Sequence, residues 1–285
     1  MGTLYVVGTP IGNLDDMSKR QIDTLKDADI ILCEDTRHSM ILLNNFNIKN
    51  KLSSYHKFNE TEKTSKVIDI LKNDKNVALI TDAGMPCVSD PGYILVKACH
   101  ENNINVVGVG GISASLTALS ISGIDSKTFS FLGFFPREKK EKEILINNIE
   151  NSFINTFIFY ESPKRIIDTL TFLYNALGNI NICVCKELTK IHEKTIANNI
   201  KTVIEILEND EDKEKGEYTV IIETESKSIK EEKMSIEAQL IDIIIKNNVT
   251  IKEAINILNE SDNTLSKKDI YNASLKLKDI LNKNK

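Results

Sequence analysis

The sequence predicts an α/β protein with two α/β domains followed by a small C-terminal helical appendage. Three observations predict this organisation. From residue 3 to about 110, short apolar runs alternate with amphipathic helical stretches, and a second such alternation runs from about 114 to 225. After Thr224 the sequence becomes polar and then purely helical in pattern. We therefore expect domains over residues 1–113, 114–226 and 227–285.

The first domain is expected to contain a mostly parallel sheet covered by helices. Its apolar runs are too short to form surface helices, and such runs suit strands that are buried on both faces. The expected strands are Leu4–Gly8, Ile30–Cys33, Leu52–Tyr55, Val77–Thr81 and Val106–Val109. Capping residues predict helix starts at Ser18 with Gln21, at Asn59 with Glu62, and at Asp90 before Pro91.

The second domain and the appendage follow the same logic. The expected strands lie near Thr128–Leu132, Thr156–Tyr160, Asn181–Cys185, Glu193–Ala197 and Tyr218–Glu223. A helix should start at Ser162-Pro163, and the acidic residues 208–212 are interpreted as a solvated loop. Two capping boxes, Thr250 with Glu253 and Ser266 with Asp269, predict two short helices in the appendage. Its apolar positions suit a helical hairpin or a helix-turn-helix: Ile251, Ala254, Ile255, Leu258, Ile270, Leu275 and Leu277.

Composition narrows the functional classes. The chain has 285 residues, of which 41% are hydrophobic, enough for two domain cores. No apolar run approaches the roughly 20 residues of a membrane-spanning helix, and the first residues lack a cationic leader, so neither export nor a membrane anchor is expected. A net charge of −5 argues against nonspecific coating of nucleic acid, because that affinity comes from displaced phosphate counterions.

The cysteines indicate a reducing compartment. The five are Cys33, Cys87, Cys99, Cys183 and Cys185, an odd and scattered set that predicts a cytoplasmic protein without a disulfide framework. Cys183 and Cys185 share one face of an expected strand and have no His or second Cys pair nearby. We interpret both as core residues and expect no metal site.

Three loops place small, proline-bearing or acidic residues at the carboxyl ends of expected strands, where open α/β sheets bind ligands. In the first, residues 8–14, Gly8 and Gly12 let the backbone approach a ligand and Pro10 stiffens the turn. Asn13 and Leu14 follow Gly12 where an ATP-binding P-loop needs Lys and Ser or Thr. The alternative interpretation is a tight turn between strand and helix.

The second and third loops differ in their chemistry. Residues 81–92 form a long loop, and long loops of this kind are usually functional. Asp90 has a structural role available as a helix N-cap and Asp82 has none, so Asp82 is the stronger functional candidate. Residues 107–115 look superficially like a dinucleotide fingerprint. Ser113 replaces the third glycine and the segment follows the fifth strand, so a nicotinamide cofactor is not expected.

Charged segments supply further candidates. Residues 34–38, 159–165 and 185–193 each combine acidic and basic side chains after an expected strand. Helix-terminus charges and surface ion pairs explain such segments equally well. Basic residues cluster at 137–142, at 164–165, and at Lys186 with Lys190. These clusters are candidates for guiding RNA, although charge runs are usually solvated faces.

Eight segments together resemble the tetrapyrrole (corrin/porphyrin) methylase superfamily, and most closely its branch that methylates small-subunit ribosomal RNA. They run in the family's order, and residues 268–271 look like the helical tail of that branch. The matching strings are Thr9-Pro10-Ile11-Gly12-Asn13-Leu14, Cys33-Glu34-Asp35-Thr36-Arg37, Ser54-Tyr55-His56, Asp82-Ala83-Gly84, Ser89-Asp90-Pro91-Gly92, Gly133-Phe134-Phe135-Pro136-Arg137, Phe159-Tyr160-Glu161-Ser162-Pro163 and Glu187-Leu188-Thr189-Lys190.

The chain departs from that pattern in two loops. Met85-Pro86-Cys87 replaces the usual Thr-Pro-Gly, and Gly110-Gly111-Ile112 replaces Pro-Gly-Pro. Gly8 and Lys164 stand where Ala and His are more usual. Both loops are expected to hold the cofactor, so these changes bear on cofactor contacts rather than on the class of reaction.

The resemblance implies the two-domain tetrapyrrole methylase fold, usually a homodimer, with S-adenosylmethionine in a cleft between the domains. It also implies methylation of a cytidine ribose 2′-hydroxyl in the decoding region of 16S rRNA, so 16S rRNA or the small ribosomal subunit would be the partner. The residues implied to bind the cofactor are Pro10, Asp82, Met85, Val88, Ser89, Ser113 and Ala114.

Methyl transfer from a sulfonium requires the ribose oxygen, the methyl carbon and the sulfur to be aligned. Because a 2′-hydroxyl is weakly acidic, a general base within hydrogen-bond reach helps. Glu161 is the first candidate for this base and Glu187 the second. Phosphate contacts, which position RNA without reading its sequence, are expected from Arg37, Arg165, Lys186 and Lys190.

Two alternatives stay open. One is a tetrapyrrole C-methyltransferase of the same superfamily, against which residues 34–37, residues 160–163 and the helical tail speak. The other is a non-catalytic ribosome-binding module without cofactor, which the two altered loops would allow. The methylase interpretation requires the loops around Pro10, Asp82 and Ser113 to converge into one crevice.

Overall fold

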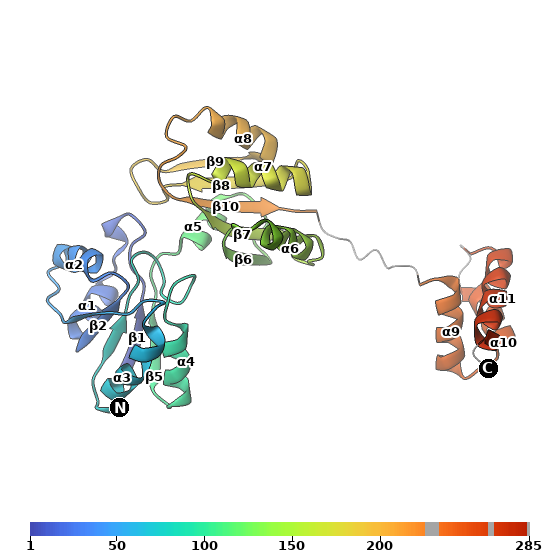
Figure 1. The fold of residues 1–285 in the computed structure, drawn as a ribbon, viewed down its shortest axis with the longest axis horizontal. Coiled ribbons are helices and arrows are strands. Elements are labelled where there is room, and N and C mark those ends of the chain that lie inside the picture. The colour runs from blue at the N-terminus through green and yellow to red at the C-terminus, as the bar shows by residue number, and fades with distance from the viewer. Residues whose placement is uncertain (226–233, 262–264, 284–285) are drawn as a thin grey trace. The chain divides into compact units, whose positions relative to one another are not determined.

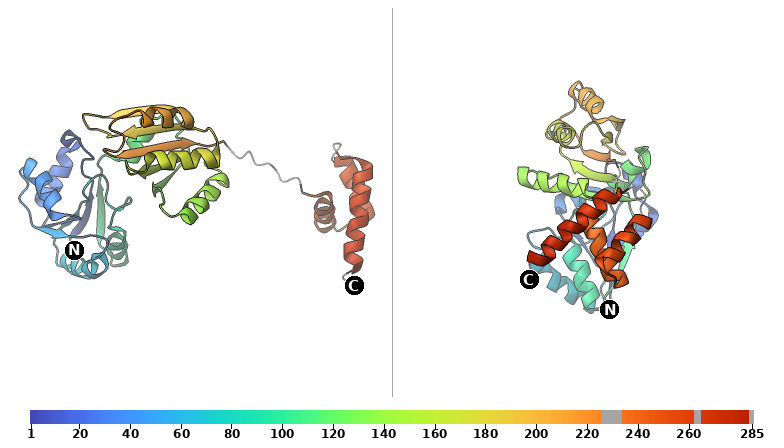
Figure 2. Two further views of the ribbon diagram at one scale, coloured as in Figure 1. Left: turned by 45° about the horizontal axis from the view of Figure 1, so that its top comes forward. Right: turned by 90° about the vertical axis from the view of Figure 1, so that its right-hand side faces the viewer.

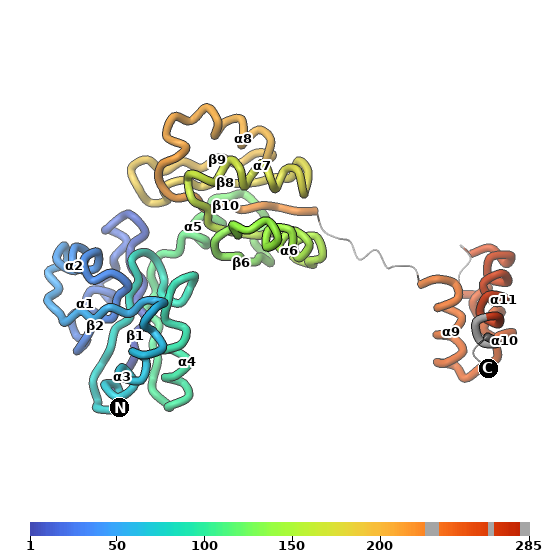
Figure 3. The backbone as a smooth tube through the Cα atoms, viewed as in Figure 1, coloured from blue at the N-terminus to red at the C-terminus, as the bar shows by residue number. Residues whose placement is uncertain are grey.

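The computed structural model describes residues 1–225, 234–261 and 265–283, and the chain divides into two compact units, Met1–Ser226 and Lys227–Lys285 (Figure 1). The first unit contains two separate sheets, built from residues 3–109 and 129–223. Figure 3 lets the reader follow the chain from the first sheet through helix α5 (Ala114–Ile121) into the second.

The first sheet is parallel throughout. Its five strands lie in the order β3-β2-β4-β1-β5. Their bounds are β1 (Thr3–Val7), β2 (Ile30–Cys33), β3 (Leu52–Ser54), β4 (Val77–Leu79) and β5 (Asn105–Val109). The five expected strands are thereby confirmed, with ends shifted by one or two residues. Because all five run the same way, the loops that follow them meet at one edge of the sheet.

Helices cover both faces of this sheet, as Figure 2 shows from two sides. The helices are α1 (Lys19–Asp27), α2 (Thr36–Asn45), α3 (Glu60–Lys72) and α4 (Tyr93–Glu101), with a short 3-10 turn, η1 (Leu14–Asp16), before α1. Successive residues of β1 point to opposite faces. Leu4 packs in a core with Leu71 of α3 and Leu95 of α4. Val7 packs in the other core with Leu25 of α1 and Leu43 of α2.

The second sheet is mixed, with its five strands in the order β6-β7-β10-β8-β9. Their bounds are β6 (Phe129–Phe134), β7 (Thr156–Glu161), β8 (Asn181–Lys186), β9 (Lys194–Asn199) and β10 (Tyr218–Glu223). β6 pairs with β7 in parallel, whereas β10 runs antiparallel to both β7 and β8. All five expected strands are confirmed.

Helices also cover both faces of the second sheet. The larger core lies under α6 (Lys139–Glu150), α7 (Ile166–Leu177) and α8 (Ile200–Glu208). On the other face, Ala118 and Leu119 of α5 pack against Ile158, Cys183 and Cys185. Both cysteines are fully buried there, which confirms their interpretation as core residues.

The second unit contains three described helices, not the two expected. They are α9 (Ile236–Asn247), α10 (Ile251–Ser261) and α11 (Lys267–Lys283). The apolar residues of α9 recur at helical spacing, and this signal was available in the sequence: Ile236, Leu240, Ile243 and Ile244. Leu275, expected in the core, is 42% exposed, so its assignment was wrong.

Helix caps were predicted with mixed success. The Ser18 and Gln21 box is confirmed in both directions, as is the box of Thr250 and Glu253. Ser266 also accepts a hydrogen bond from the backbone amide of Asp269, at 3.1 Å.

Three of the predicted caps are wrong, those at Asn59, Ser162 and Asp90, and Asp90 is described with the cavity that it lines. Asn59 precedes α3 but makes no side-chain cap bond, because its Oδ1 accepts from the His56 amide instead. The helix expected at Ser162 begins at Ile166, and Arg165 occupies the N-cap position. The Asn59 side chain is used in a local turn, whereas the Ser162 hydroxyl accepts from the Arg165 guanidinium at 3.2 Å.

Within the described ranges, no helix is long and apolar enough to cross a bilayer. In the same ranges, no group of three or more His, Cys, Asp or Glu side chains is arranged to hold a metal ion.

Candidate functional site

The loop after β1 is fastened to the loop after β4. The backbone amides of Thr9 and Gly84 each donate to the other's carbonyl oxygen, at 2.8 and 3.1 Å. The Thr9 hydroxyl donates to the Thr81 carbonyl at 3.1 Å. The Gly8 amide donates to the carbonyl of Val109, the last residue of β5, at 3.1 Å. Three strand-end loops are therefore held together by backbone hydrogen bonds.

The loop after β4 has an unusual backbone. Gly84, Cys87, Ser89 and Gly92 all have φ between 67° and 132°, in the region that favours glycine. Gly92 is required by space as well as by φ, since an added Cβ would lie 2.7 Å from the Cys87 sulfur. The turn ends at Gly92, which is the N-cap of α4.

Asp90 was expected to cap α4, and this expectation is wrong. The helix begins at Tyr93, so the Asp90 side chain is free of that role and lines a cavity instead. The sequence signal for this outcome was Gly92, because a glycine after Pro91 marks a turn rather than the first turn of a helix.

Loops from both sheets line one cavity of about 400 Å³. From the first sheet and α5 come Ile11, Glu34, residues 81–85 and 88–90, Ser113 and Ala114. From the second sheet come Phe134, residues 160–163 and residues 216–219. The predicted convergence of the loops is confirmed, and the cavity has the size of a small-molecule site.

The residues predicted to bind the cofactor are largely brought together. Six of the seven line this cavity: Asp82, Met85, Val88, Ser89, Ser113 and Ala114. Pro10 does not, although the next residue, Ile11, does. The proline instead lies between Thr9, which carries the backbone bonds to Gly84, and the part of the loop that reaches the cavity.

Three carboxylates on the first-sheet side face this cavity: Glu34, Asp82 and Asp90. The Thr81 side chain is within hydrogen-bond reach of both Glu34 and Asp90. Burial raises the pKa of Asp90 to about 6, and the charges of Glu34 and Asp82 add to the effect while Thr81 opposes it. Burial and the Asp82 charge also raise the pKa of Glu34. A carboxyl group with the raised pKa of Asp90 can accept a proton near neutral pH.

Glu161 lines the cavity but its carboxylate is fully engaged. It accepts from the Ser162 amide and from the Thr169 hydroxyl, both at 2.6 Å, and pairs with Arg165 at 2.5 Å. Arg165 also donates to the carbonyl oxygen of Phe135 at 3.1 Å. The pair holds β7, α7 and the end of β6 together, and the guanidinium expected at a phosphate is used inside the protein.

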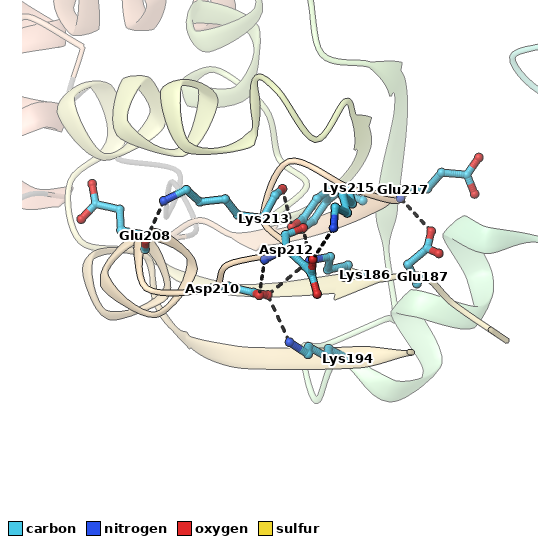
Figure 4. Close-up of polar contacts among 10 residues, drawn as sticks. Lys186, Glu187, Lys194, Glu208, Asp210, Asp212, Lys213, Lys215 and Glu217 are labelled. Carbon is cyan, nitrogen blue, oxygen red and sulfur yellow. Dashed lines mark hydrogen bonds and ion pairs between the residues drawn. The ribbon is translucent and has the colours of Figure 1, made fainter. Parts of the chain in front are cut away.

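Lys186 is also committed to an internal contact. Its side chain is 6% exposed, and its Nζ donates to the Asp212 carbonyl at 2.6 Å and to the Asp210 carboxylate at 3.2 Å. Figure 4 shows Lys186 and Lys194 converging on Asp210. A hydrogen bond from the Asp212 backbone amide and the bonds from the two lysines lower the pKa of Asp210 to about 2, against a burial effect that raises it. Asp210, expected in a solvated loop, is mostly buried.

The Lys186 contact matters because the same loop continues into the cavity wall. Residues 210–215 lie beside the lysine, and residues 216–219 follow directly and line the cavity. The Lys186 ammonium also lies 5.5 Å from the ring centre of Tyr218. The lysine therefore positions one side of the cavity.

Glu187 lies beside this wall and does not line the cavity. Its Oε1 accepts from the Glu217 amide at 3.0 Å and from Lys190 at 2.8 Å. Lys190 also pairs with Glu217 at 3.0 Å, and these bonds raise its pKa although burial opposes them. A Cβ added to Gly12 would lie 2.4 Å from Lys190, so this side chain packs on the loop after β1.

Arg37 differs from the other three predicted RNA-binding cations. Its side chain is 89% exposed, and its only described ion pair is with Asp35, at 2.7 Å. The Arg37 hydrogen bonds hold the pKa of Asp35 well below its usual range. Among the four, Arg37 presents its guanidinium most fully to solvent.

Sequence reasoning missed several residues of the cavity wall. These are Phe134, Tyr160 and residues 216–219. Asp90 was considered mainly as a helix cap and not as a cavity residue. Phe134 and Tyr160 stand in strings that matched the family, yet their aromatic rings were read only as part of the match. Residues 216–219 lie at the amino end of β10, so the rule that ligands bind at the carboxyl ends of strands gave no signal for them.

Comparison with known proteins gives consistent matches. A family described as Tetrapyrrole (Corrin/Porphyrin) Methylases matches residues 3–204. A protein of Halalkalibacterium halodurans named "Ribosomal RNA small subunit methyltransferase I" is 40% identical over 275 residues, covering 95% of this chain and 94% of that one. Proteins with the same name from Haemophilus influenzae and Bacillus subtilis are 41% and 40% identical, covering 91% and 96% of this chain and 92% and 94% of theirs.

Two solved structures share the fold at low sequence identity. A uroporphyrin-III-C-methyltransferase from Thermus thermophilus has a TM-score of 0.53 at 15% identity, covering 78% of this chain and 94% of that one. A diphthine synthase has a TM-score of 0.59 at 12% identity, covering 78% and 90%. These two structures bear on the architecture alone.

Proposed function

This chain belongs to the tetrapyrrole methylase family, and from that premise we propose that it transfers a methyl group from S-adenosylmethionine to a cytidine ribose 2′-hydroxyl in small-subunit ribosomal RNA. The methyltransferase activity and the ribosomal RNA substrate follow from relatives about 40% identical over nearly the whole chain. The 2′-hydroxyl, the cytidine and the decoding region of 16S rRNA are the finer parts of the proposal.

The observation that carries the proposal is the cavity in which loops of both sheets meet. The methyl donor, the acceptor oxygen and a proton acceptor must occupy one water-shielded space for an in-line transfer. A cavity of about 400 Å³ walled by both sheets provides such a space.

The residues on the first-sheet side fit S-adenosylmethionine. That molecule carries a sulfonium and an ammonium, and the cavity wall presents Glu34, Asp82 and Asp90. None of the three takes part in an ion pair within the described part of the chain. Carboxylates that line a cavity attract a cationic ligand bound in it.

Other wall residues would hold the rest of the cofactor. Ser113 and Ala114 stand at the start of α5, where backbone amides lack helical partners and can donate to a ligand. Met85 and Val88 supply apolar surface, and Ser89 a hydroxyl. When bound, S-adenosylmethionine supplies a methyl group activated by its positive sulfur.

We propose Asp90 as the acceptor of the 2′-hydroxyl proton. Its carboxylate faces the cavity, and burial raises its pKa to about 6, which suits a general base near neutral pH. Glu161 and Glu187 are the candidates that the sequence favoured. Glu161 is held by three donors and Glu187 by two, so we assign both to positioning the cavity wall.

The remaining parts of the proposal concern partners. Arg37 is the cation best placed to contact an RNA phosphate, because its guanidinium is exposed near the cavity residue Glu34. We further propose that the chain acts in the cytoplasm as a homodimer, as the family resemblance implies.

The function can be tested with the full-length chain and small ribosomal subunits from cells in which its gene has been deleted. We expect labelled methyl groups to appear on 16S rRNA, and mass mapping to place them on a ribose in the decoding region. Calorimetry should show S-adenosylmethionine binding. Binding without methylated RNA would favour a small-molecule methylase, and no binding would favour a non-catalytic module.

A further inference from the structure

The edge strand β6 contains a β-bulge beside the cavity. Phe131 lies opposite Ile158 and Phe134 opposite Tyr160, so three steps along β6 match two steps along β7. Gly133 lies within the bulge and has a φ of +69°, a conformation that favours glycine. Bulges of this kind re-aim side chains and are frequent next to active sites.

The bulge decides which face Phe134 occupies. In a regular strand, residues 131 and 133 would share one face and Phe134 would point to the other. With one extra residue, Phe134 takes the place beside Phe131 on the face of Tyr160. The ring centres of Phe131 and Phe134 lie 5.0 and 5.5 Å from that of Tyr160, both edge-on.

Two consecutive phenylalanines have opposite environments as a result. Phe135 is 1% exposed and packs in the core against Phe159. Phe134 is 63% exposed and lines the cavity. The core does not use most of the Phe134 ring, so its exposed surface at the cavity wall is available to a ligand.

The support of Phe134 is rigid. The Phe135 amide donates to the Tyr160 carbonyl at 3.0 Å, and Arg165, itself paired with Glu161, donates to the Phe135 carbonyl at 3.1 Å. A Cβ built on Gly133 would lie 3.5 Å from the Ser89 hydroxyl, so the bulge adjoins the loop after β4. The backbone that carries the ring is thereby held between the two halves of the cavity wall.

We infer that Phe134 is a stacking surface for an unpaired nucleobase of the RNA, that of the nucleotide being methylated. This inference rests on the proposed function. A ribose whose 2′-hydroxyl enters the cavity carries its base out of the neighbouring stack, and proteins hold such bases on aromatic side chains. The acids of the first-sheet side bind cationic groups, whereas Phe134 offers a neutral flat face at the exposed part of the wall.

The test compares Phe134→Ala with Phe134→Trp, using small ribosomal subunits from the deletion strain as substrate. Base stacking on an aromatic ring corresponds to roughly a tenfold effect on RNA affinity. We expect Phe134→Ala to raise the KM for subunits about tenfold and Phe134→Trp to stay near wild type. The Kd for S-adenosylmethionine, measured by calorimetry, should change less than about twofold in both. Phe153→Ala is the matched control, because Phe153 is 82% exposed and lies outside the cavity wall.

Three results would overturn the inference. An unchanged KM for subunits in Phe134→Ala would remove the stacking role. A parallel loss of S-adenosylmethionine binding would show that the ring covers the cofactor. If the wild type sediments as a dimer and Phe134→Ala as a monomer, the ring contacts a second copy of the chain. If wild-type protein does not methylate the subunits at all, the proposed function fails first, and this result is distinct from the other three.

Discussion

The two sides of the cavity use charge differently. On the first-sheet side, backbone hydrogen bonds and left-handed residues shape the loops, and Glu34, Asp82 and Asp90 face the cavity without a described ion pair. On the second-sheet side, Glu161 and Lys186 are already paired with Arg165 and Asp210. In this cavity, the carboxylates without an ion pair are therefore those whose loops are held mainly by backbone hydrogen bonds.

The largest effect that would test this contrast comes from Asp90. We expect Asp90→Asn to lower kcat about 10³-fold, because general-base catalysis typically contributes 10²–10⁴-fold. Glu161→Gln is the matched variant from the other side of the cavity. It should lower kcat less than about tenfold and lower the unfolding midpoint, because it leaves Arg165 without its carboxylate. A larger kcat loss in Glu161→Gln than in Asp90→Asn would reverse the assignment.

The pH dependence of the reaction sharpens the same assignment. A base must be deprotonated to act, and burial raises the pKa of Asp90 to about 6. We therefore expect kcat/KM to rise as pH increases through about 6 and to level off above 7. The Asp90→Asn variant should lack this rise. A flat profile for the wild type between pH 5 and 7 would argue against a carboxylate base with this pKa.

Lys186→Met tests the second-sheet side. The substitution removes the hydrogen bonds of Lys186 to Asp210 and Asp212 while Lys194 still pairs with Asp210, so the expected loss of stability is about 2 kcal/mol. Because residues 216–219 line the cavity, the Kd for S-adenosylmethionine should also rise several-fold. Urea unfolding and calorimetry measure the two effects. Lys215→Met is the control from the same loop, since its pair with Asp212 is exposed, and its unfolding midpoint should not move.

The contrary outcome for Lys186 is equally specific. If Lys186→Met keeps its unfolding midpoint and its cofactor affinity but raises the KM for small subunits, the lysine contacts RNA phosphate as its sequence motif suggested. The described contacts with Asp210 and Asp212 would then have to open when RNA binds.

The strands were predictable because each is a continuous apolar run, and a strand buried on both faces leaves that trace in the sequence. Ion pairs between residues far apart in the chain leave no comparable pattern in the sequence. Lys186 and Asp210 are 24 positions apart, and only the fold places them 3.2 Å apart. For this reason Lys186 and Arg165 were predicted to bind phosphate although both are used internally.

The site was predicted in part for a related reason. Backbone loops at the carboxyl ends of parallel strands follow from topology, so Asp82 and Ser113 were found. The role of Asp90 depends on the left-handed residues around it, at Ser89 and Gly92. Its position directly before Pro91 in the sequence predicted only a helix cap. Phe134 required the bulge at Gly133, which shifts the alternation of β6 by one residue.

Gly8 tests how closely the backbone of the first-sheet side is packed. A Cβ on Gly8 would lie 2.7 Å from both the Gly111 Cα and the Met85 sulfur. Gly8→Ala should therefore destabilise the fold by about 2 kcal/mol in urea unfolding, as overpacking does. Gly110→Ala is the control, because nothing lies within 4 Å of its added Cβ. Equal stability of the two variants would mean that the loop after β5 can shift freely.

The smallest effect is expected from Arg37, whose substitution should change RNA binding and neither stability nor cofactor binding. Its guanidinium is exposed, so Arg37→Ala should leave the unfolding midpoint and the Kd for S-adenosylmethionine unchanged. The KM for small subunits should rise a few-fold. The slope of log K for RNA binding against log salt concentration should decrease in magnitude by about 1, as expected for the loss of one phosphate contact. Lys66→Ala removes another exposed cation, paired with Glu62 on α3, and should change neither quantity. If both variants weaken RNA binding alike, the effect comes from net charge, and the first-sheet side presents no specific phosphate contact at Arg37.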